Sequence, residues 1–218
     1  MNTQIRKRYK SGNYITVYHG NCIDVLKQIE DESLQLIVTS PPYNIGKEYE
    51  KKKSMDEYLH SQEEVINLCA KKLKSRGSIC WQVGNNILGN KKKAEVFPLD
   101  IILYHLFKQN ELILRNRIVW HFGHGLHNEY RFVGRHETIL WFTKTDDYTF
   151  NLDPVRVKQK YPGKKHYKGP NKGKYSGNKK GKNPSDVWDI PNVKANHVEK
   201  TLHPCQFPIA LVERLIKA

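Results

Sequence analysis

The sequence predicts an α/β fold built around a mainly parallel sheet. Short apolar segments with strand character alternate with segments of helical spacing along its first two thirds, a pattern typical of strands joined by crossover helices. A stiff polar segment, Ser40-Pro41-Pro42-Tyr43, directly follows one of the expected strands. Ligands of such sheets bind beyond the carboxyl ends of the strands, so this segment marks the edge at which we expect the functional site.

The first elements alternate as that fold requires. β-Branched and aromatic residues predict a strand at residues 14–18, and apolar residues at helical spacing predict a helix over residues 22–29. The apolar run at residues 34–39 is the next strand. Residues 55–73 carry an apolar face at helical spacing and are expected to form a long amphipathic helix, which Gly77 ends.

The alternation continues toward the C-terminal region. Strands are expected at residues 78–83, 112–120 and 138–142, and a helix is expected over residues 98–107. The proline that opens this helix suits a first helical position. Residues 208–218 have an apolar stripe at helical spacing, which predicts a helix packed on the core.

Size and charge narrow the class of protein. A chain of 218 residues suggests one domain, or one domain with a modest insertion. Lysine and arginine outnumber the acidic residues by 37 to 22, and the net charge of +15 favours a polyanionic partner, most simply nucleic acid.

The sequence contains no apolar run that could span a bilayer and no secretory signal. Four cysteines without CxxC spacing indicate a reduced, cytoplasmic chain rather than a disulfide framework.

One segment concentrates the positive charge. Residues 156–182 contain no acidic residue, and lysine or arginine recurs at about every second or third position among glycines and tyrosines. Such a segment cannot bury an apolar face, and its cations suit the phosphates of DNA. A solvated basic tail is the alternative interpretation. The residues expected to contact DNA are Lys47, Arg156, Lys158, Lys160, Lys164, Lys165, Tyr167, Lys168, Lys172 and Lys174.

In combination, the motifs resemble those of one family, the β group of amino-directed DNA methyltransferases that use S-adenosylmethionine. The family fingerprint is (Asp, Asn or Ser)-Pro-Pro-(Tyr or Phe), which Ser40-Pro41-Pro42-Tyr43 matches. Further segments similar to family motifs are Tyr18-His19-Gly20-Asn21-Cys22, the run from Arg135 to Phe142 and the run from Thr201 to Pro208. The order of these motifs, with the catalytic motif near the N-terminus, resembles the circular order of the β group.

The resemblance implies a Rossmann-like methyltransferase sheet in circularly permuted order, with a basic recognition insertion. It divides the chain into a catalytic α/β part (residues 1–150), a target-recognition, DNA-contacting insertion (residues 151–196) and a return to the catalytic domain (residues 197–218). The residues that it assigns to the cofactor S-adenosylmethionine are Asn21, Cys22, Ser40, Thr201, His203, Cys205 and Gln206.

The chemistry implied by the resemblance falls on Ser40, Pro41, Pro42 and Tyr43. An exocyclic amine of cytosine or adenine is a weak nucleophile because its lone pair is delocalised into the ring. The Ser40 hydroxyl and the Pro41 carbonyl are expected to accept the hydrogens of that amine, which positions it for in-line transfer. Tyr43 is expected to stack on a base flipped out of double-stranded DNA. No metal is required.

The spacing of His121, His124 and His127 has two interpretations. A His-x-x-His-x-x-His run could bind a metal, but a metal site would need carboxylate or cysteine partners on a defined scaffold. We favour a loop near the DNA or the flipped base.

Three departures from the family pattern qualify the resemblance. The family more often has aspartate at the position that Asn21 occupies here. Phe207 replaces the usual lysine of the His-Pro-x-Gln-Lys-Pro motif. The β group continues after its last helix with a strand and an Asp-Pro-Phe-x-Gly-x-Gly turn around the cofactor, whereas this sequence stops at Ala218. We therefore expect a sheet that lacks two strands and leaves the catalytic strand with an unpaired edge. This pattern favours a truncated product, or one subunit of a split enzyme with a second polypeptide supplying the cofactor loop.

The predicted function is site-specific DNA methylation in the cytoplasm of a prokaryote or phage-infected cell, in association with the nucleoid. A cognate restriction endonuclease is a further expected partner. Serine at the first motif position favours cytosine N4 over adenine N6 as the acceptor. The alternatives are a non-catalytic DNA-binding remnant and a methylase of protein glutamine or RNA. The motif order argues against the last class, because those enzymes carry Asn-Pro-Pro-Tyr after their cofactor motif.

Overall fold

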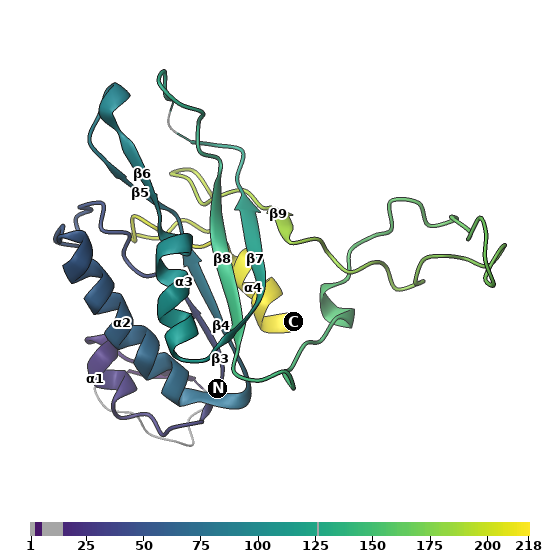
Figure 1. Ribbon diagram of the computed structural model, residues 1–218, viewed down its shortest axis with the longest axis horizontal. Helices are drawn as coiled ribbons and strands as arrows, with labels where there is room; N and C mark the ends of the chain where they lie inside the picture. The colour runs from purple at the N-terminus through teal and green to yellow at the C-terminus, as the bar shows by residue number, and fades with distance from the viewer. Residues whose placement is uncertain (1–2, 6–14, 126) are drawn as a thin grey trace.

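The computed structural model describes residues 3–5, 15–125 and 127–218, with only the backbone for residues 3–5. Tyr14, the first residue of the first predicted strand, lies outside the described residues. A five-stranded sheet forms the centre of the molecule (Figure 1). Its strands, in spatial order, are β3 (Leu34–Thr39), β4 (Leu73–Val83), β8 (His136–Thr143), β7 (Ile113–His121) and β9 (Val187–Asp189).

The pairing directions give four strands a common orientation. β3 pairs with β4 in parallel, and β7 pairs with β9 in parallel. β8 lies antiparallel to both of its neighbours, so β7 points the same way as β4. The predicted α/β class with a mainly parallel sheet is therefore confirmed. The carboxyl ends of β3, β4 and β7 meet at one edge, where the segment after β3 is the Ser-Pro-Pro-Tyr motif.

Helices α2 (Met55–Lys72) and α3 (Leu99–Gln109) cover one face of this sheet (Figure 1). A capping box starts α2, because the Ser54 hydroxyl accepts from the Glu57 amide while the Glu57 carboxylate accepts from the Ser54 amide. Phe107 of α3 stacks on Phe142 of β8 at 4.4 Å between ring centroids, within a fully buried cluster. This face forms the larger core.

The prediction that Gly77 ends the long helix is wrong. α2 ends at Lys72, and β4 begins at once with the buried Leu73. Gly77 lies inside the strand, where a Cβ would come within 2.8 Å of the Leu73 side chain. The glycine thus permits close packing in β4, and the tight helix-to-strand junction has no separate loop.

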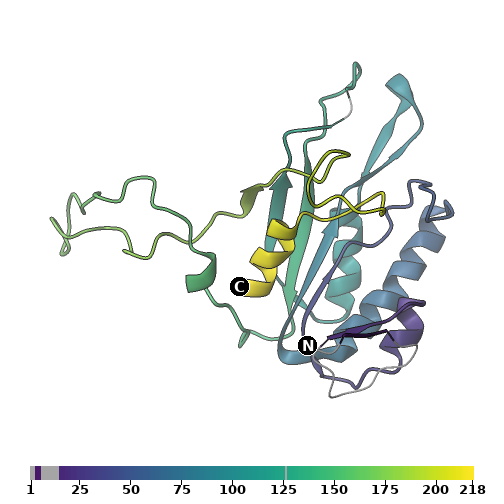
Figure 2. The ribbon, with the colours of Figure 1, turned by 180° about the vertical axis from the view of Figure 1, so that it is seen from behind.

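Helix α4 (Ile209–Lys217) covers the opposite face, as the view from behind shows (Figure 2). Its buried residues Leu211 and Leu215 pack with Ile118, Ile139 and Trp188 from the sheet. The predicted core-packing helix is confirmed.

The N-terminal elements lie beside the main sheet. β1 (Thr3–Ile5) and β2 (Ile15–Val17) form a separate parallel pair. The short helix α1 (Cys22–Leu26) is three residues shorter than predicted and lies against α2. Within the described residues β3 pairs only with β4, so it is an edge strand of the sheet.

Two projections leave the body. One is a hairpin of β5 (Asn85–Leu88) and β6 (Glu95–Pro98), joined by a turn with the short 3-10 helix η1 (Lys91–Lys93); sequence patterning did not predict it. The other is an extended arm, residues 156–182, which follows the 3-10 helix η2 (Asp153–Val155) (Figures 1 and 2). The arm's only bridges within the described residues are Val157 with Lys182 and Lys165 with Tyr175. β9 then joins the sheet from inside the predicted recognition insertion.

The described cysteines are all free, and burial raises the pKa of Cys69 and of Cys80 to about 12. Among the helices of the described residues, none combines the length and apolar character that crossing a membrane demands.

Candidate active site

The loop after β3 is fixed by its own hydrogen bonds. Asn44 is buried with a left-handed backbone (φ 58°), and its side chain accepts from the Lys53 amide at 2.7 Å and donates to the Lys53 carbonyl at 2.9 Å. The Glu50 carboxylate accepts the backbone amides of Asn44, Ile45 and Gly46 at 2.8–3.1 Å. These bonds pin the loop at both ends. The preceding Ser-Pro-Pro-Tyr turn is therefore presented rigidly.

A hydrogen-bonded series joins three strand ends above the sheet. The hydroxyls of Ser40 and Tyr43 lie 3.1 Å apart, and the Tyr43 hydroxyl donates to Glu137 Oε2 of β8 at 3.1 Å. The Gln82 amide of β4 donates to the same carboxylate oxygen. Gly84 makes this packing possible, since a Cβ there would lie 3.0 Å from the Tyr43 ring and 3.2 Å from Glu137 Oε1.

The direction of these bonds fixes what Ser40 can offer. Tyr43 has one hydroxyl hydrogen, and it is donated to Glu137. The bond between the two hydroxyls must then be donated by Ser40, which also has only one hydrogen. The lone pairs of the Ser40 oxygen are left to accept hydrogen bonds from a third group.

Burial sets the protonation of the two groups behind Ser40. Burial, and secondarily the Glu137 charge, raises the pKa of the Tyr43 phenol far above its ordinary value. Tyr43 therefore keeps its proton at physiological pH. Burial also raises the pKa of Glu137, and the hydrogen bonds from Tyr43 and Gln82 oppose that rise.

A second loop, residues 199–206, reaches the same strand end. The Tyr49 hydroxyl donates to Cys205 Sγ at 3.3 Å, and the Tyr49 ring lies 5.6 Å from the His203 ring. Within the loop, Gln206 Oε1 accepts from both the amide and the hydroxyl of Thr201 at 2.8–2.9 Å. Four predicted cofactor residues are thus held together, next to the loop that follows Ser40.

The other two predicted cofactor residues lie elsewhere. Asn21 caps α1 by accepting the Ile23 amide at 2.9 Å. Cys22 lies near Cys69, in the last turn of α2, and its charge contributes to the raised pKa of that thiol. The Ser-Pro-Pro-Tyr loop precedes the opposite end of α2, so Asn21 and Cys22 do not gather with Ser40. Their assignment to the cofactor stays a prediction.

The motif and its setting have close counterparts among known proteins. Residues 34–218 match the family model of the N6 and N4 DNA methylases. Over 200 residues, the chain is 50% identical to the type II methyltransferase M.BglII of Bacillus subtilis, a match covering 92% of this chain. The chain belongs to the DNA methylase family. It spans 55% of the length of M.BglII.

Solved structures share the methylase fold. The cytosine-N4-specific PvuII DNA methyltransferase aligns with a TM-score of 0.69 at 19% identity, over 92% of this chain and 68% of its own. A DNA modification methylase from Thermus thermophilus, solved with S-adenosyl-L-methionine, aligns with a TM-score of 0.59 at 19% identity, over 100% and 75% of the two chains.

The basic residues of the chain that were predicted to contact DNA separate into two kinds. The lysines predicted to contact DNA in the arm, and Tyr167 with them, are exposed. Arg156 differs, because its guanidinium pairs with Asp153 at 2.8 Å and donates to the Gly181 carbonyl at 3.0 Å. Its side chain is only 14% exposed. Arg156 therefore fastens the base of the arm, and the free cations lie farther out. Lys47 is exposed in the loop after the motif.

The histidines of the β7–β8 connection form no common site. His121 Nδ1 lies 3.0 Å from the Asp189 carboxylate of β9. Within residues 3–5, 15–125 and 127–218, no group of three or more His, Cys, Asp or Glu side chains is arranged to hold a metal ion.

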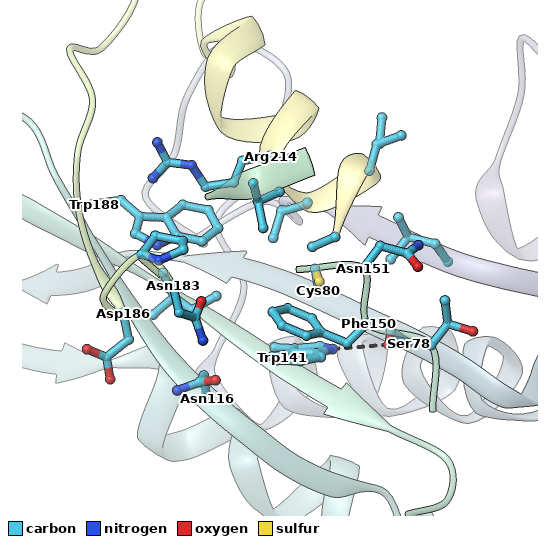
Figure 3. A pocket seen from close by; sticks show the side chains of 18 of the residues that line it. Ser78, Cys80, Asn116, Trp141, Phe150, Asn151, Asn183, Asp186, Trp188 and Arg214 are labelled. Atoms are coloured by element: carbon cyan, nitrogen blue, oxygen red, sulfur yellow. Dashed lines mark hydrogen bonds between the residues drawn. The ribbon is translucent and has the colours of Figure 1, made fainter. Parts of the chain in front are cut away.

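The chain also has an aromatic cavity of about 350 Å³ on the α4 face, away from Ser40. Trp141, Phe150, Trp188 and Arg214 line it, and the Trp141 indole donates to Ser78 Oγ at 3.0 Å (Figure 3). No residue of the Ser40–Tyr43–Glu137 series is among its lining residues.

Sequence reasoning missed Glu137 and Gln82. Each is a polar residue within a strongly apolar strand. A polar residue that interrupts an apolar strand was the signal in the sequence that could have identified them. Asn86 was missed as well. It is fully buried, and its amide donates to the carbonyls of Tyr43 and Asn44 at 2.8 Å each. All three support the backbone or hydroxyl of Tyr43.

Proposed function

We propose that this chain carries the catalytic part of a DNA amino-methyltransferase, in which Ser40 activates an exocyclic amine of a flipped base. The observation that carries the proposal is the series Ser40–Tyr43–Glu137, which leaves the Ser40 oxygen as a hydrogen-bond acceptor. Membership of the DNA methylase family supports double-stranded DNA as the substrate.

Ser40 and the turn after it supply the activation. An amine hydrogen donated to Ser40 Oγ, and the other to the Pro41 carbonyl, would draw the nitrogen toward a tetrahedral shape and free its lone pair. The fixed loop holds these acceptors in place, so positioning lowers the barrier. Tyr43 is half-buried and anchored through its hydroxyl, so the exposed part of its ring is a rigid stacking surface for the base.

The residues near Ser40 fit S-adenosylmethionine in part. When bound, it supplies an electrophilic methyl group on a sulfonium. Thr201, His203, Cys205 and Gln206 would hold it beside Ser40, because Tyr49 docks their loop onto the loop after the motif. A protein of similar fold was solved with this cofactor. A second polypeptide could complete the site, because Asn21 and Cys22 do not reach this edge.

We infer cytosine N4 as the target in preference to adenine N6, on the serine at the first motif position. Both amines present the same N–H donors to Ser40, so this is the finer part of the proposal. M.BglII is a type II methyltransferase, which supports a prokaryotic restriction-modification setting with a cognate endonuclease.

Labelled methyl transfer tests this function. The chain, alone and with the product of a neighbouring gene, is incubated with methyl-labelled S-adenosylmethionine and unmethylated duplex DNA, and nucleosides are identified by mass spectrometry. We expect N4-methylcytosine, and none with Ser40→Ala. If N6-methyladenine were found instead, the proposed methyl transfer would stand but the assignment of cytosine as the target base would be overturned. Absence of transfer, together with absence of cofactor binding by calorimetry under both conditions, would overturn the function.

A further inference from the structure

The β5–β6 hairpin is an ordered projection from the edge of the sheet that carries the Ser-Pro-Pro-Tyr turn. It leaves β4 through Gly84 and pairs Ile87 with Val96 and Leu88 with Glu95 in an antiparallel ladder. Its turn is specific: Gly89 has a positive φ of 80°, and a Cβ there would lie 2.7 Å from the Lys93 carbonyl. Figures 1 and 2 show the hairpin standing clear of the five-stranded sheet.

The tip of this hairpin carries three consecutive cations. Lys91, Lys92 and Lys93 form η1 and are all exposed. In the part of the chain that the structure describes, none of the three forms an ion pair within 4.0 Å. Lys92 Nζ lies 5.8 Å from the centroid of the Tyr130 ring, on the loop between β7 and β8. The tip therefore presents uncompensated positive charge beside an aromatic loop.

The root of the hairpin is tied to the catalytic turn. Asn86 of β5 is fully buried and donates to the backbone carbonyls of Tyr43 and Asn44. Four residues of β-strand rise about 13 Å, so the lysines stand beyond the sheet edge that carries Ser40 and Tyr43. Under the proposed function, a duplex that delivers a base to Ser40 passes this edge, which brings its phosphates toward the lysines.

We propose that the β5–β6 hairpin is a second DNA contact, separate from the arm, whose lysine tip binds backbone phosphates flanking the target base. The inference rests on the proposed function for the nature of the partner. Phosphate contacts by lysine carry no sequence information but set register and orientation. Because Asn86 joins hairpin and turn, this contact orients the duplex relative to Ser40. The arm binds the duplex farther from the reacting base.

A matched pair of charge-removing variants tests this proposal. Lys92→Gln/Lys93→Gln removes two cations from the tip, and the control Lys71→Gln/Lys74→Gln removes two exposed cations from the opposite end of α2 and β4. Binding of a fluorescent duplex is measured by anisotropy from 50 to 200 mM salt without cofactor. Thermal melting verifies that both variants are folded.

We expect the hairpin variant to bind more weakly on every duplex. The slope of log K against log salt should become shallower by about 1.8, or about 0.9 per phosphate contact. Between 50 and 200 mM salt, the hairpin variant should therefore lose about tenfold less affinity than the wild type loses. The control should keep the wild-type slope. Equal slopes for the two variants would overturn the proposal, and so would an unchanged affinity, which would point to an acidic protein partner. This experiment measures DNA binding and not methyl transfer. A failure of the proposed function in the methyl-transfer assay can therefore be told apart from a failure of this proposal.

Discussion

The turn after β3 and the arm of residues 156–182 carry opposite kinds of polar residue. In the turn, each polar group has a defined partner: Ser40 and Tyr43 bond to each other and Glu137 lies behind them. The arm has many lysines, few partners and two isolated bridges. Buried polar groups must be satisfied, whereas exposed lysines stay solvated at little cost. The turn is therefore suited to directional chemistry, and the arm to attraction that depends on charge and salt.

The largest effect is expected from the arm. Changing Lys164, Lys165, Lys168, Lys172 and Lys174 to glutamine removes up to five phosphate contacts, so the salt slope of DNA binding should become shallower by up to about 4.5. Affinity should fall on all sequences, as measured by anisotropy. The single-turnover methylation rate at saturating DNA should stay within about twofold, because Ser40 is untouched. A slowed reaction at saturation would show that the arm also positions the base, which would break the division between the two regions.

A smaller effect is expected from Glu137 on stability. Burial raises its pKa above the ordinary value of 4.5. The folded protein favours the neutral carboxyl more than the unfolded chain does. The stability that this preference contributes is fully present below the pKa that Glu137 has in the unfolded chain, and it is lost as pH rises through the higher pKa of the folded state. Wild-type Tm should therefore fall over that window, whereas Glu137→Gln, which cannot ionise and keeps an acceptor for Tyr43 and Gln82, should remove part of the fall.

Thermal melting between pH 4 and 7 checks this difference, with Glu213→Gln as a control at an exposed carboxyl on α4. If the two variants showed parallel Tm curves, the buried carboxyl would not carry the pH dependence of stability, and the turn would not be coupled to its protonation.

Much of the fold was predictable because its signals are local. β3 and the Ser-Pro-Pro-Tyr turn are contiguous in sequence, and α4 has an unbroken apolar stripe. The junction at Lys72 and Leu73 was not, because tertiary packing rather than Gly77 ends the helix. Glu137 and Gln82 meet only because β8 lies antiparallel beside β4, a pairing that sequence order does not reveal. The hairpin was missed because its strands are four residues long and its turn is polar.

The predicted cofactor set shows the same limit. Thr201, His203, Cys205 and Gln206 are close in sequence, and they gather as one loop. Their position near Ser40 depends on Tyr49, a contact across 156 residues. Asn21 was grouped with them by motif resemblance alone. It lies at the start of α1, near the C-terminal end of α2, whereas the loop after the motif leads into the N-terminal end of α2.

The most direct test of the central claim removes one oxygen atom. Tyr43→Phe deletes the hydroxyl that accepts from Ser40 and donates to Glu137, while the ring remains. Without it, the Ser40 hydrogen is free to point at the amine, and the acceptor geometry is lost. We predict that the single-turnover methylation rate falls about 100-fold, with the Kd for duplex DNA within about twofold of wild type. An unchanged rate, or equal losses of rate and affinity, would contradict the claim that this series makes Ser40 the acceptor.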